Sequence, residues 1–263
     1  MKKTGLIYRL LVPVLAILLL SFVWKPQEKP VFYIIGDSTV RNGDGTGKGS
    51  LWGWGSFIAD QVDTNRLQVQ NHAMGGRSSR TFQTEGRWDK IMKTLKKGDY
   101  VIMQFGHNDA SPLDDTARAR GVLRGISDKD TLIYNPIRKM QETVNTYGWY
   151  MRKFVKDTKS KGATPIICSL VPRNSWKEGK VQRSGDSWAG WAKQVAAEEG
   201  AFFIDLNELV AAEYDQLGAE KIKALYFPSD NTHTNLEGAK INAGYVIDQL
   251  RKQNPAMISQ YLK

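Results

Sequence analysis

Ser38, Asp230 and His233 are the residues whose types and spacing most directly suggest chemistry. Asp230 and His233 lie three apart in the segment PSDNTH (228–233), so the Asp230 carboxylate can accept the Nδ1–H of His233 and leave Nε2 free as a base. Ser38 follows an apolar segment in GDST (36–39). These are the groups of serine-type acyl transfer, although an ordinary turn and a solvated loop explain each segment separately.

Two further loops carry groups that suit an oxyanion. The segment AMGGRS (73–78) has paired glycines, which let a backbone N–H approach a ligand closely, although a tight turn explains them equally well. The segment GHND (106–109) contains Asn108, whose amide donates a hydrogen bond without adding charge. The four loops together contain a nucleophile, a base with its carboxylate, and two donors.

The elements that must position these loops form a strand–helix alternation. Short apolar segments rich in β-branched and aromatic residues predict five buried strands. They span Val31–Ile35, Leu67–Asn71, Tyr100–Phe105, Thr164–Leu170 and Ala201–Ile204. Alternation with helices favours one α/β domain over residues 31–263, with a parallel sheet covered on both faces. Ligands of such sheets bind beyond the carboxyl ends of the strands, where the four loops lie.

Capping signals predict four of the intervening helices. The first helix begins at Asn135-Pro136 and ends before Gly162, and the second spans Trp188–Glu199 before Gly200. The third helix follows the capping box of Asp205 and Glu208 and ends at Gly218. The fourth follows the capping box of Thr234 and Glu237 and spans Leu236 to about Gln253.

The first 24 residues have the pattern of a targeting segment. Lys2, Lys3 and Arg9 precede the apolar run Leu10–Trp24, which predicts a signal peptide or an N-terminal signal anchor over residues 1–24. A buried first helix is the alternative. Residues 25–30 (KPQEKP) are predicted to form a linker. The protein is therefore expected to be exported and to be periplasmic, extracellular or anchored at the outer face of the membrane, with membrane contact only through an uncleaved signal anchor.

Composition excludes several classes of function. The 263 residues include 37 Lys and Arg against 27 Asp and Glu, a formal charge of +10. Three of these cations lie in residues 1–24, so the rest of the chain carries +7. An exported chain without a basic run or a recognised reading motif is not expected to bind nucleic acid. One Cys rules out a disulfide framework, and three His without HExxH leave little room for zinc, so no metal or cofactor is expected.

The order of the four loops resembles that of the SGNH (GDSL-type) hydrolases, in which Ser, Gly, Asn and His occur in this sequence. The segments GDSTV (36–40), GRSSR (76–80), FGHND (105–109) and YFP (226–228) are similar to those of rhamnogalacturonan acetylesterases, over about residues 31–253. The resemblance implies a flavodoxin-like three-layer α/β/α sandwich with a central five-stranded parallel sheet. It implies removal of O-acetyl groups from rhamnogalacturonan I, an acidic pectic polysaccharide.

The resemblance also implies a role for each matching residue. Ser38 would be the nucleophile, His233 the general base and Asp230 its orienting carboxylate. The oxyanion hole would consist of the backbone N–H groups of Ser38 and Gly76 and the side-chain amide of Asn108. The neighbouring Gly75 is an alternative to Gly76, which is preferred because it directly precedes Arg77-Ser78.

The predicted substrate-binding residues are three arginines and two tryptophans. Arg77, Arg80 and Arg87 lie in or just after the second loop, where they suit substrate carboxylates, with structural ion pairs as the alternative. Trp52 and Trp54 lie in the glycine-rich segment 41–55, which we expect at the mouth of the site. They offer a face for sugar stacking, with burial against the next helix as the alternative.

Other functions remain open on the sequence. An SGNH enzyme with these loops could instead deacetylate xylan or another glycan, or act as a lipase or thioesterase. A different class is a non-catalytic glycan-binding domain on the same fold. The sequence says nothing about the oligomeric state.

Overall fold

The computed structural model describes residues 28–263. The predicted signal segment 1–24 and the first residues of the predicted linker lie outside the described residues. Within the described part of the chain, no helix combines the length and the apolar character needed to cross a membrane.

A five-stranded parallel sheet forms the centre of the molecule. Its strands stand in the order β2-β1-β3-β6-β9, which is the strand order of flavodoxin-like folds. They are β1 (Val31–Gly36), β2 (Gln68–Asn71), β3 (Tyr100–Gln104), β6 (Thr164–Cys168) and β9 (Phe202–Ile204). All five predicted strands are present. β2 lies at an edge and is only half-buried, whereas β1 and β3 are buried along their whole length.

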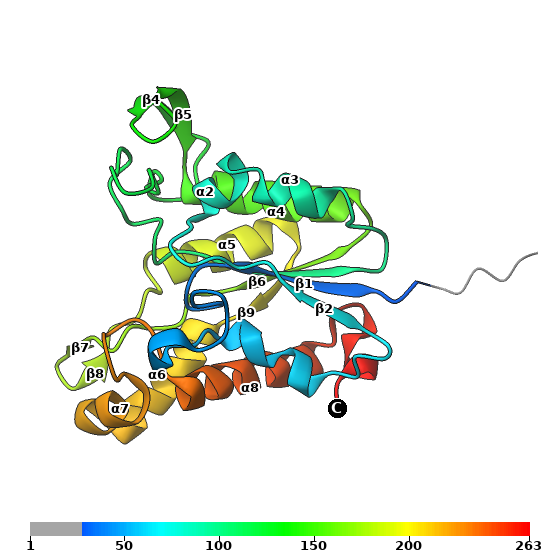
Figure 1. Cartoon of the computed structure of the whole chain (residues 1–263), viewed down its shortest axis with the longest axis vertical. Helices are drawn as coiled ribbons and strands as arrows, with labels where there is room; N and C mark the ends of the chain where they lie inside the picture. Colours follow the sequence, from blue (N-terminus) through cyan, green and yellow to red (C-terminus); the bar gives the residue numbers. More distant parts are fainter. Residues whose placement is uncertain (1–27) are drawn as a thin grey trace, which may run out of the picture.

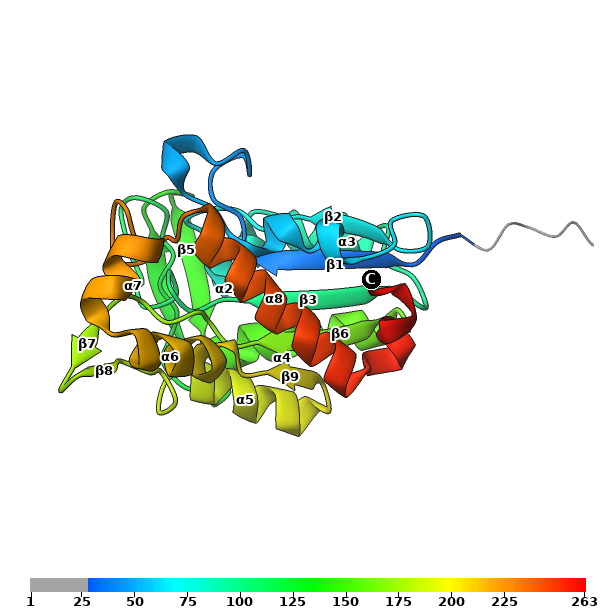
Figure 2. The same cartoon turned by 90° about the horizontal axis from the view of Figure 1, so that it is seen from below.

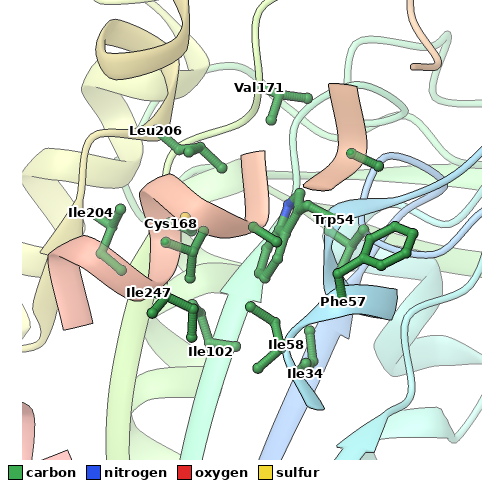
Figure 3. Close-up of a cluster of buried hydrophobic side chains, with 14 of the residues drawn as sticks. Ile34, Trp54, Phe57, Ile58, Ile102, Cys168, Val171, Ile204, Leu206 and Ile247 are labelled. Atoms are coloured by element: carbon green, nitrogen blue, oxygen red, sulfur yellow. The ribbon is translucent and has the colours of Figure 1, made fainter. Parts of the chain in front are cut away.

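Alternating strand residues divide the apolar core between the two faces of the sheet. Tyr33 and Met103 belong to one buried cluster, whereas Ile34 and Ile102 belong to the other. Helices α2 (Ser79–Thr84), α3 (Arg87–Met92), α4 (Tyr147–Ser160) and α5 (Trp188–Glu199) cover the first face, and α6 (Leu206–Leu217) and α8 (Leu236–Gln253) cover the second (Figure 1). The side chains that fill the second cluster include Trp54 from the 3-10 helix η2 (Figure 3). The predicted three-layer α/β/α sandwich is therefore confirmed.

The helices are α2 (Ser79–Thr84), α3 (Arg87–Met92), α4 (Tyr147–Ser160), α5 (Trp188–Glu199), α6 (Leu206–Leu217), α7 (Ala219–Tyr226) and α8 (Leu236–Gln253). Short 3-10 helices cover Lys48–Ser50, Trp54–Phe57, Ala59–Gln61 and Pro255–Tyr261. The predicted spans of α5 and α8 are confirmed. In α6, the Asp205 side chain caps the helix at the N–H of Glu208, and Gly218 ends it, also as predicted.

One predicted helix start is wrong. Asn135-Pro136 does not open a helix but turns the antiparallel hairpin of β4 (Asp130–Asn135) and β5 (Met140–Asn145). The Asn135 side chain accepts hydrogen bonds from the N–H groups of Ile137 and Arg138. The same side-chain bonds can close a turn or cap a helix, so the Asn-Pro pair alone did not distinguish a hairpin turn from a helix start. Helix α4 begins later, capped by Thr146.

Helix α8 begins where it was predicted to begin, but the predicted cap residue is wrong. Asn235, not Thr234, is the N-cap residue, and its side chain accepts a hydrogen bond from the N–H of Gly238. Thr234 instead pairs through its backbone with Trp52.

The loops that follow the carboxyl ends of the strands lie together at one end of the sheet. β1 ends at the same side of the molecule as the β4–β5 hairpin, the short β7–β8 hairpin (Trp176–Lys177 and Lys180–Val181) and α7 (Figures 1 and 2). Loops from distant parts of the sequence therefore meet beyond the carboxyl ends of the strands, as the parallel sheet requires.

Candidate active site

The turn after β1 holds Ser38 at the carboxyl edge of the sheet. Oδ1 of Asp37 accepts hydrogen bonds from the N–H and the hydroxyl of Thr39, at 2.9 and 2.7 Å. The backbone carbonyl of Asp37 accepts from the N–H groups of Val40 and Arg41 at 3.2 and 3.0 Å. Because the turn is bonded from both sides, the half-buried Ser38 side chain leaves it in a fixed direction.

Ser38, His233 and Asp230 form one hydrogen-bonded chain. Nε2 of His233 lies 2.8 Å from Oγ of Ser38, and Nδ1 lies 2.8 Å from Oδ2 of Asp230. An ionised carboxylate only accepts hydrogen bonds, so Nδ1 carries the proton and Nε2 accepts from the Ser38 hydroxyl. The structure thus brings Ser38 into contact with His233, although the two residues are 195 positions apart in the sequence.

The Asp230 carboxylate is held in its charged form. Partial burial alone would raise its pKa, but hydrogen bonds from the side chain and N–H of His233 and the N–H of Thr232 lower the pKa below its ordinary value. The two N–H groups donate to Oδ1 at 2.7 Å each, which leaves Oδ2 for the imidazole. The carboxylate therefore keeps the imidazole oriented and can stabilise it once protonated.

Two other loops fix the segment that carries His233. The N–H of Trp52 donates to the carbonyl of Thr234 at 2.8 Å, and the N–H of Asn174 donates to the carbonyl of Asn231 at 2.8 Å. The glycine-rich segment 41–55 thus reaches from the turn of Ser38 to the His233 segment, which agrees with its expected place at the mouth of the site.

The loop of the predicted oxyanion glycines reaches Ser38. A Cβ built on Gly75 would stand 3.6 Å from Cβ of Ser38, so this glycine lies directly against Ser38. Gly76 has a φ of +73°, in the left-handed region that favours glycine, and a Cβ there would meet Arg118 at 2.7 Å. Nδ2 of Asn108 donates to the carbonyl of Arg77 at 3.1 Å, so Asn108 lies next to the glycine pair.

A buried carboxyl joins the glycine loop to the loop of Asn108. Asp109 accepts hydrogen bonds from the N–H and hydroxyl of Ser79, at 3.0 and 2.5 Å, and from the N–H of Gly106 at 3.0 Å. Burial raises the pKa of Asp109 to about 7, although the bonds from Ser79 oppose this shift. Asp109 therefore ties together the two loops that supply the expected oxyanion donors.

The prediction that Trp54 offers a sugar-stacking face is wrong. Its side chain is fully buried in the core cluster under β1 and β3. Its indole N–H donates to Oε1 of Gln104 at 2.9 Å, and Nε2 of Gln104 donates to the hydroxyl of Thr39 at 2.6 Å. Trp54 therefore does not face the site but supports, through Gln104 and Thr39, the turn that carries Ser38.

The prediction that Arg80 binds substrate is also wrong. Its side chain is 0% exposed and forms an ion pair with Glu142, with 2.7 Å between Nε and Oε1. Its Nη1 donates to the carbonyls of Leu113 and Gly121 at 2.9 Å each. Arg80 is buried because α2 places its side chain between Glu142 of β5 and two carbonyls of the segment 112–122.

The other predicted contact residues remain accessible. Arg77 and Arg87 share the Glu85 carboxylate, at 3.1 and 2.6 Å, so each cation already has a partner. Trp52 is half-buried, with its ring against Phe57, and stays beside the His233 segment through its backbone. Contacts between these three residues and a substrate remain predictions.

Two arginines near the site were missed by the sequence reasoning. Arg173 follows β6 and donates through Nη1 to the hydroxyl of Thr232, between Asp230 and His233 in the chain. Arg118 lies over Gly76. Among residues 28–263, neither arginine forms an ion pair with a carboxylate. Arg173 could have been found because it lies just beyond the end of a predicted strand, whereas no local signal marked Arg118.

Two open clefts lie near the site, one lined by Arg173, which bonds Thr232, and the other lined by residues of the His233 segment itself. The first, of about 310 Å³, is lined by Gly106, His107, Arg173, Gln182, Ser187 and Trp188, among others. The second, of about 410 Å³, is lined by Asn174, Trp176, Phe227, Ser229, Asp230 and Asn231, among others. Burial lowers the pKa of His107 to about 4, so its ring is neutral at physiological pH. Within residues 28–263 no cluster of three His, Cys, Asp or Glu side chains is arranged to hold a metal ion.

Comparison with known proteins agrees with this geometry. A model of the GDSL-like lipase/acylhydrolase family matches residues 34–241. The rhamnogalacturonan acetylesterase of Emericella nidulans is 36% identical over 212 residues, which cover 80% of each chain. A Bacillus subtilis protein named probable rhamnogalacturonan acetylesterase YesY is 30% identical, over 88% of this chain and 97% of that protein.

Solved structures share the fold. The crystal structure of YxiM from Bacillus subtilis superimposes with a TM-score of 0.68 at 28% identity, over 86% of this chain and 57% of that one. Axe2, an acetylxylan esterase from Geobacillus stearothermophilus, gives a TM-score of 0.55 at 18% identity, over 84% and 94% of the two chains. The family match covers most of the chain, and the order of its four loops is that of the family. The chain therefore belongs to the GDSL-like lipase/acylhydrolase family and is a carboxylic-ester hydrolase.

Proposed function

We propose that this protein is a serine acetylesterase that removes O-acetyl groups from an acidic pectic polysaccharide, rhamnogalacturonan I. The observation that carries the chemistry is the continuous chain from Ser38 through His233 to Asp230, with both hydrogen bonds at 2.8 Å. A nucleophile bonded to a base, and a base oriented by a carboxylate, is the arrangement that acyl transfer requires.

The reaction proceeds in two halves. Oγ of Ser38 attacks the acetyl carbonyl carbon while its proton passes to Nε2 of His233. The tetrahedral intermediate collapses, the proton moves from Nε2 to the leaving sugar oxygen, and an acetyl-Ser38 ester remains. Water then attacks this ester with Nε2 as the base, and acetate leaves as Ser38 recovers its proton. Asp230 stabilises the imidazolium in both halves without taking its proton.

The oxyanion of each intermediate is stabilised by the donors around Ser38. We assign this role to the backbone N–H groups of Ser38 and Gly76 and to the amide of Asn108, with Gly75 as the alternative to Gly76. Removing one such donor typically lowers kcat by about 10²–10³. Support comes from the hydrogen bond that holds Asn108 to Arg77, directly after the glycine pair.

An acidic glycan suits the surroundings of the site better than a lipid does. The two clefts are open, and Arg, Asn, Gln and Ser side chains line them together with apolar ones such as Leu170 and Phe227, whereas an acyl chain would need a continuous apolar channel. Arg118 and Arg173 flank the site as cations without carboxylate partners among the described residues, and a guanidinium binds a galacturonate carboxylate in a bidentate fork. The names of the relatives from Emericella nidulans and Bacillus subtilis support the same substrate. An exported enzyme would meet this polymer, which agrees with the predicted signal segment.

Acetate release from acetylated rhamnogalacturonan, homogalacturonan and xylan tests the proposal, with p-nitrophenyl esters of acetate and octanoate as small neutral substrates. We expect preference for rhamnogalacturonan and for the acetyl ester. The Ser38→Ala variant should lose essentially all turnover on every substrate. Activity that survives in this variant contradicts the mechanism. Preference for xylan contradicts the substrate assignment alone, and preference for octanoate indicates a lipase.

A further inference from the structure

The amide of Asn108 is held by hydrogen bonds at both of its ends. Nδ2 donates to the carbonyl of Arg77 at 3.1 Å, and Oδ1 accepts from Nη1 of Arg120 at 3.3 Å. A guanidinium only donates and a carbonyl only accepts, so these two partners determine which end of the amide is which. The amide nitrogen carries two hydrogens, and the Arg77 carbonyl uses one of them. The other is available to an oxyanion.

Arg120 is itself held in place by a carboxylate. Its Nε lies 2.7 Å from Oδ2 of Asp115. Burial alone would raise the pKa of Asp115, but the hydrogen bonds from the Arg120 side chain and from the N–H groups of Ala117 and Arg118 lower it below its ordinary value. Asp115 therefore stays charged, and the Arg120 guanidinium is bonded to Asp115 and Asn108 at once.

The backbone around Arg120 is anchored on both sides. The N–H of Ala119 donates to the carbonyl of Asp115 at 2.6 Å, and the N–H of Val122 donates to the carbonyl of Asp109 at 3.1 Å. The carbonyl of Gly121 accepts from the buried Arg80 side chain. Arg120 thus projects from a fixed segment next to the loop of Asn108.

We propose that Arg120 is a positioning residue of the ester hydrolysis, which acts through Asn108 rather than through the substrate. The inference rests on the proposed oxyanion role of Asn108. The guanidinium prevents the amide from rotating, so that its free N–H keeps one direction. Its positive charge also polarises the amide through Oδ1, which makes the remaining N–H a stronger donor. Both effects act when negative charge develops in the transition state.

A role in binding the substrate carboxylate would give a different kinetic signature. A residue that binds carboxylates changes the KM of anionic substrates and leaves a neutral ester unaffected. A residue that orients an oxyanion donor changes kcat by the same factor on neutral and anionic substrates, because both form the same tetrahedral intermediate.

A double-mutant cycle on p-nitrophenyl acetate and on an acetylated acidic oligosaccharide tests the proposal. The Arg120→Gln variant should lower kcat by about 10-fold on both substrates with little change in KM, and Asn108→Ala should lower it by about 10²–10³. The double variant should be no slower than Asn108→Ala, because Arg120 has no effect without the amide. Additive losses, unchanged kcat, or an effect confined to the KM of the anionic substrate each overturn the proposal.

Two further variants separate this role from folding and from net charge. Arg120→Lys retains the cation and can pair with Asp115 but cannot bond both partners at once, so it should fold and lose kcat by about 3-fold. Full kcat in this variant also overturns the proposal. Arg251→Gln removes the same charge from an ion pair with Asp248 on α8 and should leave the kinetics unchanged. If Asn108→Ala keeps full kcat, the oxyanion assignment in the proposed function is what fails.

Discussion

Trp54 shows how a buried side chain can support the turn of Ser38, the proposed nucleophile, without approaching the substrate. Its indole N–H bonds Gln104, which bonds Thr39, whose hydroxyl donates to Asp37. All four side chains are at most 5% exposed. Each donor in this chain has one acceptor, so the loss of the first bond leaves Oε1 of Gln104 without a partner in a place that water does not reach readily.

The Trp54→Phe variant should therefore lose about 1–3 kcal/mol of unfolding free energy, the cost of leaving one buried acceptor unsatisfied. Urea unfolding followed by circular dichroism measures the loss. Trp176→Phe is the matched control, because Trp176 is half-buried and its indole bonds the local Asn174 side chain, so this variant should lose less. Equal losses in the two variants would contradict the importance of the buried chain.

At the scale of elements, the Arg80–Glu142 pair connects three parts of the structure. Arg80 lies on α2, Glu142 lies on β5, and the Arg80 guanidinium also bonds two carbonyls of the segment 112–122. Nδ2 of Asn135, at the end of β4, donates to the same Glu142 carboxylate. The hairpin projects from the molecule with several exposed apolar side chains, so this buried pair is a main attachment of its base (Figure 1).

The Glu142→Gln variant should lose about 3–5 kcal/mol at neutral pH, because the buried Arg80 cation would remain without its counter-charge. Burial alone would raise the pKa of Glu142, but hydrogen bonds from Arg80 and Asn135 lower it below its ordinary value. The carboxylate therefore stabilises the fold above the ordinary pKa of glutamate, and this contribution is lost as the pH falls through the lowered value.

Unfolding of the two proteins at neutral and at acidic pH checks this sign. The difference in unfolding free energy should be largest at neutral pH and should shrink in acid. Asp128→Asn is the control, because Asp128 pairs with Arg152 at an exposed position and should change stability by less than about 1 kcal/mol. A Glu142→Gln protein as stable as the parent at neutral pH would refute the account.

At the scale of the whole molecule, the positive charge is consistent with an acidic polymer as substrate. Outside residues 1–24 the chain carries a formal +7. Several arginines of the second loop are already paired, whereas Arg118 and Arg173 are not paired among the described residues. Exposed charges of this kind raise the local concentration of an anion and are screened by salt.

Rising salt should therefore lower kcat/KM for acetylated acidic oligosaccharides while hydrolysis of p-nitrophenyl acetate changes little. Arg118→Gln and Arg173→Gln should each raise KM for the acidic substrate by about 2- to 5-fold, as expected for exposed ion pairs. Steady-state kinetics over a salt series measure both effects. The same salt dependence for the neutral and the acidic substrate would rule out electrostatic steering.

The sequence predicted those parts of the fold that depend on interactions between neighbouring residues. Apolar strands and the ends of α5, α6 and α8 depend on neighbouring residues, so they were predicted with their approximate bounds. Asn135-Pro136 was misinterpreted because the same side-chain bonds close a turn or begin a helix, and only the pairing of β4 with β5 selects the turn. Thr234 was misinterpreted because its backbone pairs with Trp52, far away in the sequence.

The sequence by itself determined which chemical groups are present and at which strand ends they lie, because residue type and strand periodicity are local properties. Ser38 and Asn108 were identified in this way, and Asp230 and His233 were identified by their spacing in the loop before the last helix. The tertiary structure alone decided which side chains are buried and which are paired. Burial and pairing depend on contacts between distant segments, which the sequence does not show. For this reason only the structure showed that Arg80 and Trp54 are buried and that Arg120 bonds the amide of Asn108.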